Sequence, residues 1–117
     1  MRNIMNTQNS KVVIQSIDFK SSRKRLAFVR RQVSKLELLT DRIIEIRVSL
    51  KMDGDAESNK VCEIGVSVPG KDLFVSKKSD TFEESVNLAV DALRHQIETW
   101  KATIAGRNRN FRESIES

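Results

Sequence analysis

One long apolar stripe in the last third of the chain constrains the fold more than any other feature. Its members recur at steps of 4, 3, 4, 4, 3 and 4 residues, the spacing of one face of an α-helix: Phe82, Val86, Ala89, Leu93, Ile97, Trp100 and Ile104. A stripe of about six turns needs an apolar cover, and we expect a sheet to supply it. Asp80 and Glu83 predict a capping box at its start, and Gly106 predicts its end.

The rest of the chain predicts one more helix and four strands. Ser21 and Ser22 can cap a helix that runs to about Leu38, with an apolar stripe of Leu26, Val29, Val33 and Leu36. Short segments rich in β-branched residues predict strands at residues 11–17, 43–50, 60–68 and 72–77. In the second strand, one buried face is expected from Ile44, Ile46, Val48 and Leu50; in the third, from Cys62, Ile64, Val66 and Val68.

This order predicts an α+β fold of the form β-α-β-β-β-α, similar to the double-stranded-RNA-binding plan. The first helix would cross between parallel first and second strands, and Pro69-Gly70 would make a tight turn in a meander of the last three strands. Both helical stripes need the same cover, so we expect two helices on one face of a four-stranded mixed sheet. A chain of 117 residues fits one domain at residues 11–105, flanked by a flexible N-terminus (1–10) and a flexible polar tail (106–117).

Positive charge is concentrated in the first half of the chain. The net charge is +5, and residues 1–51 carry 12 basic and 4 acidic side chains, which gives +8. On the first helix, Lys24, Arg31 and Lys35 point away from the apolar stripe, with Arg23 and Arg30 on their flank. A solvated helix face usually mixes charges of both signs. The pattern therefore favours a surface that faces phosphates over a merely solvated one.

The sequence carries no pattern that predicts catalysis, a cofactor or a metal. Cys62 is the single cysteine and His95 the single histidine, and there is no Ser-His-Asp set and no phosphate-cradling glycine loop. The polar loop at residues 52–59 lacks the final glutamate of a calcium loop. No apolar run approaches the ~20 residues of a membrane span, so we expect a cytoplasmic protein, with Cys62 as a small core residue.

Two stretches resemble the ribosome hibernation promoting factor family, also called ribosome-associated inhibitor or sigma-54 modulation proteins. They are VPGKDLFVSKKSDTFEESVNLAVDALRHQIETWK, residues 68–101, and FVRRQVSKLELLTDRI, residues 28–43. The family's pattern is matched at Val68-Pro69-Gly70, Leu73-Phe74-Val75-Ser76, Asp80, Phe82, Val86, Asp91, Leu93 and Gln96, and in the first helix at Lys35-Leu36-Glu37 and Asp41-Arg42-Ile43. The resemblance spans about residues 11–104.

The resemblance implies a protein that binds the small ribosomal subunit in the channel for messenger RNA and tRNA and inhibits translation under stress or in stationary phase. The two single-sided helical stripes and the half-buried strands predict that it is a monomer. Lys77-Lys78 would add charge beside the basic helix, and on the second helix Arg94, His95 and Lys101 remain as candidate rRNA contacts. The family's usual basic positions there read Ala92, His95 and Thr99. Either the contacts shift toward the first helix, or this chain binds at a different place or binds more weakly. The alternatives are a generic double-stranded-RNA-binding or RNA-chaperone module and a protein-interaction domain.

Overall fold

The fold, seen in a computed structural model, is an α+β sandwich of one sheet and one helical layer. The structure describes residues 10–55 and 57–116, with side chains up to Gly106. The predicted flexible segment at residues 1–10 thus lies almost wholly outside the described residues. The elements follow the order β-α-β-β-β-α, as predicted; their bounds are β1 (Lys11–Ser16), α1 (Arg23–Glu37), β2 (Glu45–Met52), β3 (Lys60–Val68), β4 (Lys71–Ser79) and α2 (Phe82–Glu116).

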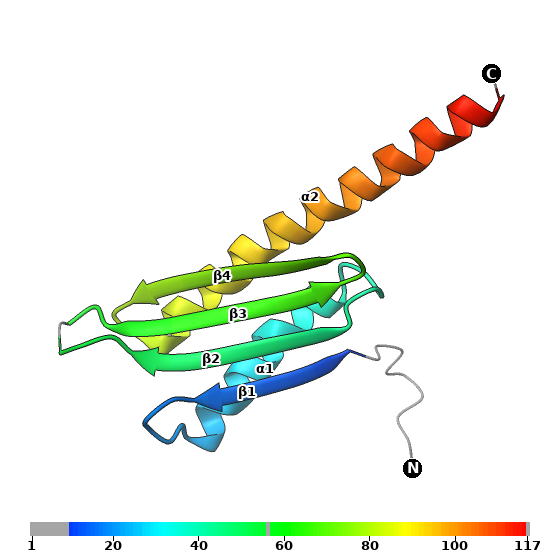
Figure 1. The fold of residues 1–117 in the computed structure, drawn as a ribbon. Coiled ribbons are helices and arrows are strands. Elements are labelled where there is room, and N and C mark those ends of the chain that lie inside the picture. Colours follow the sequence, from blue (N-terminus) through cyan, green and yellow to red (C-terminus); the bar gives the residue numbers. More distant parts are fainter. Residues whose placement is uncertain (1–9, 56, 117) are drawn as a thin grey trace, which may run out of the picture.

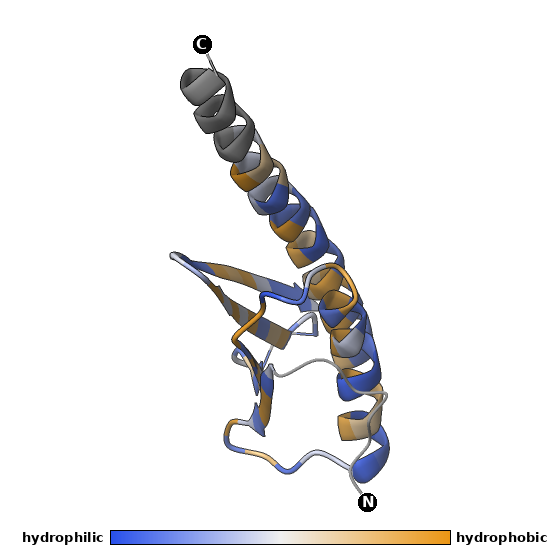
Figure 2. Cartoon of the chain, turned by 90° about the vertical axis from the view of Figure 1, so that its right-hand side faces the viewer, coloured by the Kyte–Doolittle hydropathy of each residue, from blue (hydrophilic) through white to orange (hydrophobic). Residues whose placement is uncertain are grey.

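The sheet is mixed and its spatial order is β1-β2-β3-β4. β1 runs parallel to β2, and α1 makes the crossover between them, while β2, β3 and β4 form an antiparallel meander. Gly70 follows Pro69 in the turn between β3 and β4 and has φ 78°, a conformation that glycine adopts without strain. Both helices lie on one face of the sheet, and no described element covers the other face, which we call the open face (Figures 1 and 2). The predicted fold class is confirmed.

The core lies between the helical layer and the sheet. From α2, the side chains of Val86, Ala89, Leu93 and Ile97 are 0% exposed, and Trp100 is 5% exposed. Alternate residues of β3 and β4 meet them, among them Ile64, Val66 and Leu73. Both predicted helical stripes therefore face the sheet. One strand prediction is wrong, because Ile44 is 57% exposed and Ile43 is buried in its place; β2 begins only at Glu45.

The ends of α2 differ from the sequence prediction. The cap is Thr81, whose hydroxyl accepts a hydrogen bond of 3.0 Å from the Glu84 amide, while the carboxylate of Asp80 accepts one from Ser58. The N-cap is thus Thr81 rather than Asp80, and the carboxylate of Glu84 accepts a hydrogen bond from the Ser79 hydroxyl, so the predicted capping box of Asp80 and Glu83 is wrong. The helix also continues through Gly106 to Glu116 and extends past the sheet (Figure 1). A glycine inside a helix costs only ~1 kcal/mol, and no proline follows it. The domain boundaries themselves stay predictions.

Cys62 is a core residue, as predicted. Its side chain is 0% exposed, and burial raises the pKa of its thiol from 9.0 to about 12, with a smaller contribution from the charge of Glu63. In the unfolded chain the thiol ionises near its ordinary value, while in the folded chain it stays protonated. The stability due to this difference is complete below pH 9.0 and is lost as the pH rises toward about 12.

We therefore expect alkaline destabilisation that depends on Cys62. Above pH 9.0 the free energy of unfolding should fall more steeply with pH in the natural chain than in Cys62→Ala. The difference between the two slopes should reach up to about 1.4 kcal/mol per pH unit. Urea melts at a series of pH values would measure both slopes. Equal slopes in the two chains would show that the thiol is not the group that titrates.

Candidate nucleic-acid interface

Five cations of α1 form one exposed surface, which we call the helix-1 cationic face: Arg23, Lys24, Arg30, Arg31 and Lys35. The helix starts at Arg23 because the Ser22 hydroxyl accepts a hydrogen bond of 3.1 Å from the Arg25 amide. Its rotation is fixed by Val29, Val33 and Leu36, which are buried against the sheet. The cations have to point elsewhere, so the apolar stripe that drives folding also sets the direction of the charged surface.

The helix-1 cationic face has two rows. Lys24, Arg31 and Lys35 lie on the side of α1 next to α2, where two hollows open between the helices. The first hollow is lined by Lys24 and Arg31 together with Glu83 of α2. The second is lined by Lys35 together with Asn87 and Arg94 of α2. Arg23 and Arg30, seven residues apart, form the other row on the opposite flank.

None of these five side chains forms an ion pair within the part of the chain that the structure describes. By contrast, the described cations elsewhere are often paired, as in Lys51–Glu63 at 3.1 Å and Lys78–Asp53 at 3.2 Å. Among the described aromatic residues, Phe28 lies near one of the five, with the centre of its ring 5.9 Å from the Arg31 guanidinium. The helix-1 cationic face therefore carries positive charge that no ion pair among the described residues neutralises, and such a surface attracts polyanions.

Arg25 interrupts this surface and has a different role. Its guanidinium lies 5.0 Å from the centre of the Phe82 ring and 3.6 Å from the Glu83 carboxylate. Phe82 also stacks on Phe19, with 5.1 Å between the ring centres. Arg25 thus joins the start of α1 to the start of α2. Sequence periodicity could not reveal this, because it depends on which helix ends meet.

The three predicted residues of α2 are exposed, and two of them, Arg94 and Lys101, already contact other groups of the protein. Arg94 lies between two acids of its own helix, with Asp91 at 2.5 Å and Glu98 at 3.8 Å, and its hydrogen bond lowers the pKa of Asp91. Lys101 donates a hydrogen bond of 2.6 Å to the carbonyl of Leu39, just beyond the end of α1. The positive charge of α2 is thus partly neutralised or engaged, so α1 carries the larger free charge.

Lys77 and Lys78 do not form a joint contact surface. Successive side chains of a strand point to opposite faces, and Lys77 has the same parity as Leu73 and Val75, which face the helices. Lys78 lies on the open face, where it pairs with Asp53. The structure therefore separates the two lysines that the sequence analysis treated as one basic contact.

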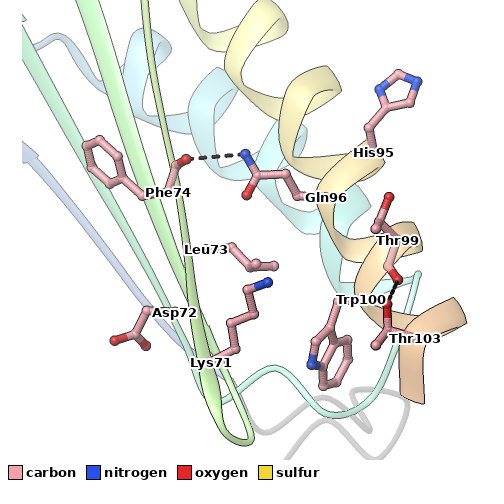
Figure 3. A pocket seen from close by; sticks show the side chains of 9 residues that line it. All are labelled: Lys71, Asp72, Leu73, Phe74, His95, Gln96, Thr99, Trp100 and Thr103. Atoms are coloured by element: carbon pink, nitrogen blue, oxygen red, sulfur yellow. Dashed lines mark hydrogen bonds between the residues drawn. The ribbon is translucent and has the colours of Figure 1, made fainter. Parts of the chain in front are cut away.

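His95 lies apart from the cationic rows, beside a cleft of ≈ 580 Å³ between β4 and α2. Its ring nitrogen Nδ1 is 3.0 Å from the Asp91 carbonyl oxygen. Figure 3 shows the imidazole directed away from β4, whereas Gln96 reaches across to donate a hydrogen bond of 3.3 Å to the Phe74 carbonyl. The cleft is lined mainly by neutral and apolar side chains, so it is not an extension of the helix-1 cationic face.

Comparison with known protein families shows the family to which this chain belongs. The model of the sigma 54 modulation protein / S30EA ribosomal protein family matches residues 12–105. This chain belongs to that family. The matched region contains α1, β2, β3, β4 and all of β1 except Lys11, and it ends one residue before Gly106 of α2, so the S30EA match covers every predicted site residue. No curated protein matches the chain.

Solved structures share the S30EA fold. A ribosomal subunit interface protein from Coxiella burnetii superimposes with a TM-score of 0.71 at 17% identity, over 79% of this chain and 98% of that one. The N-terminal domain of Protein Y from Thermus thermophilus gives a TM-score of 0.64 at 18% identity, over 80% of this chain and 97% of that one. At this identity the likeness establishes the fold.

Among the described side chains, no group of three or more His, Cys, Asp or Glu residues is arranged to hold a metal ion. No described helix combines the length and the apolar character that crossing a membrane requires.

Proposed function

We propose that this protein binds the small ribosomal subunit near the channel for messenger RNA and tRNA, and that it inhibits translation and promotes ribosome hibernation under stress or in stationary phase. The helix-1 cationic face would contact rRNA phosphates, with smaller contributions from Arg94 and Lys77. The protein would act in the cytoplasm by occupying a site, without catalysing a reaction and without a cofactor.

The observation that carries this proposal is the unpaired charge of α1. Five exposed cations lie on one helix, and none has an acidic partner among the described residues. Ribosomal RNA presents a dense array of phosphates, and recognition of structured RNA depends largely on shape and backbone contacts. Membership of the S30EA family supports a ribosomal partner. The family match and the charge pattern thus favour the same class of partner independently.

The proposal is tested by adding purified protein to separated ribosomal subunits and centrifuging each mixture through a sucrose gradient. We expect the protein to sediment with the small subunit and to stay at the top of the gradient with the large subunit. Messenger RNA or a tRNA anticodon stem-loop should reduce the bound fraction by competing for the channel.

A short RNA duplex is the control that separates the alternatives. Equal affinity for the duplex and for small subunits would indicate a generic double-stranded-RNA-binding module. If the protein bound neither the duplex nor small subunits in low salt, a nucleic-acid function would be contradicted. A protein-interaction domain would then be the remaining alternative.

A further inference from the structure

The open face of the sheet differs from the helix-1 cationic face in its charge. Its cations are Lys11, Arg47, Lys51 and Lys78, and its acids are Glu45, Glu63 and Asp72. Three of the four cations have acidic partners at 3.1 to 3.6 Å: Arg47–Glu45, Lys51–Glu63 and Lys78–Asp53. This near-balance of charge means that any partner of the open face must be held mainly by something other than long-range attraction.

The open face presents an aromatic ring on its edge strand β4. Phe74 is 58% exposed, although a phenyl ring gains most from burial. Figure 3 shows the ring on the side of β4 away from α2, so neither of the described helices covers it. The ring is not part of the core, because the opposite face of β4 supplies Leu73 and Val75 to it.

Arg47 and Phe74 flank a glycine in one row across the sheet. Arg47 of β2 pairs with Gly65 of β3, which pairs with Phe74 of β4. The guanidinium nitrogen of Arg47 lies 3.3 Å from the place where a Cβ atom of Gly65 would stand. The missing side chain thus lets the planar guanidinium lie across the middle strand, next to the position of the ring.

We propose that the open face binds single-stranded nucleic acid, with unpaired bases stacking on Phe74 and on the guanidinium of Arg47. Every base has a flat π-face, and aromatic rings and guanidinium planes both accept stacked bases. A hollow of ≈ 470 Å³ on the same face, lined in part by Lys51, Ser76 and Lys78, continues along β4 from Phe74 and would take the adjoining phosphate. Exposed ion pairs are weak, so a phosphate can displace Glu63 or Asp53 from these lysines.

This site is distinct from the proposed rRNA contact and does not rest on it. The two sites are on opposite sides of the sheet, since α1 covers the other face. Their salt dependence should also differ: the helix-1 cationic face depends on phosphate contacts and weakens steeply with salt, whereas stacking persists.

The test uses an unstructured single-stranded RNA oligonucleotide that contains 2-aminopurine, whose fluorescence reports stacking, in high salt. The natural chain should bind and change the fluorescence. Phe74→Leu should weaken binding by about 5- to 150-fold, the range for loss of one stacked base, whereas Phe74→Tyr, which keeps the ring, should bind normally. Arg47→Lys keeps the positive charge but loses the planar guanidinium group. It should therefore weaken binding, although an effect of charge alone would leave the affinity unchanged.

Thermal melts of all variants separate binding from folding, because Phe74 could instead stabilise the sheet by covering Gly65. Equal binding by Phe74→Leu and the natural chain would overturn the proposal, as would equal losses in Phe74→Leu and Phe74→Tyr. Absence of oligonucleotide binding by the natural chain would also overturn it and would leave a protein partner for this face. Changing Arg30, Arg31 and Lys35 to glutamate should leave the high-salt binding intact, so failure of the proposed rRNA contact can be recognised separately.

Discussion

Changing Arg30, Arg31 and Lys35 to glutamate is expected to lower the affinity for small ribosomal subunits by about two orders of magnitude or more. The reason is that each substitution replaces an attraction to phosphate by a repulsion, at a surface whose cations form no ion pair among the described residues. The fold should persist, because all three side chains are exposed and lie away from the buried stripe of α1. Sedimentation of the variant with small subunits measures the bound fraction, and a thermal melt checks the fold.

A matched control distinguishes a local contact from net charge. Lys11, Arg42 and Lys71 are equally exposed, and none of them lies on a helix. Their change to glutamate alters the net charge by the same amount, but it should reduce the affinity far less. Equal losses in the two triple variants would mean that total charge, rather than the helix-1 cationic face, controls binding. The search for the contact would then move to Arg94, His95 and Lys101.

Leu93→Ala should cause the largest single loss of stability. Leu93 is 0% exposed at the middle of α2, within the core cluster that joins both helices to the sheet. Truncation removes buried contacts and leaves a cavity, which costs about 2–5 kcal/mol and threatens a small domain. Urea melts measure the free energy of unfolding.

Leu88→Ala is the control for this prediction, because it makes the same chemical change on the same helix at a side chain that is 44% exposed. It should cost less than about 1 kcal/mol. A similar loss for the two variants would show that α2 does not bury the face assigned to the core.

The fold could be predicted because the sequence repeats the same information in several forms. The stripe of α2, the stripe of α1 and the alternation in β2 and β3 each require one apolar cover, and a single sheet face satisfies all of them. The helix ends were harder to place. Thr81 and Asp80 are both good caps, and only the position of Ser58, more than twenty residues earlier, shows that Asp80 is engaged elsewhere.

The sequence could predict which side of α1 is exposed, but not which contacts its neighbours make. Helical phase correctly placed the cations of α1 on an exposed surface, because the buried stripe fixes the phase. Phase could not show that Lys101 contacts the Leu39 carbonyl or that Arg25 packs on Phe82, since these contacts join elements far apart in the chain. The separation of Lys77 from Lys78 was available from strand alternation, whereas the place of Gly65 between Arg47 and Phe74 required the strand register.

The salt dependence of binding to purified small subunits tests the central claim most directly. Each phosphate neutralised by the protein contributes about 0.7 to 0.9 to the slope of log affinity against log salt. Changing Arg30, Arg31 and Lys35 to alanine should therefore make the slope shallower by about two to three units, with the fold intact. An unchanged slope in the folded triple alanine variant would contradict the assignment of rRNA phosphate contacts to the helix-1 cationic face.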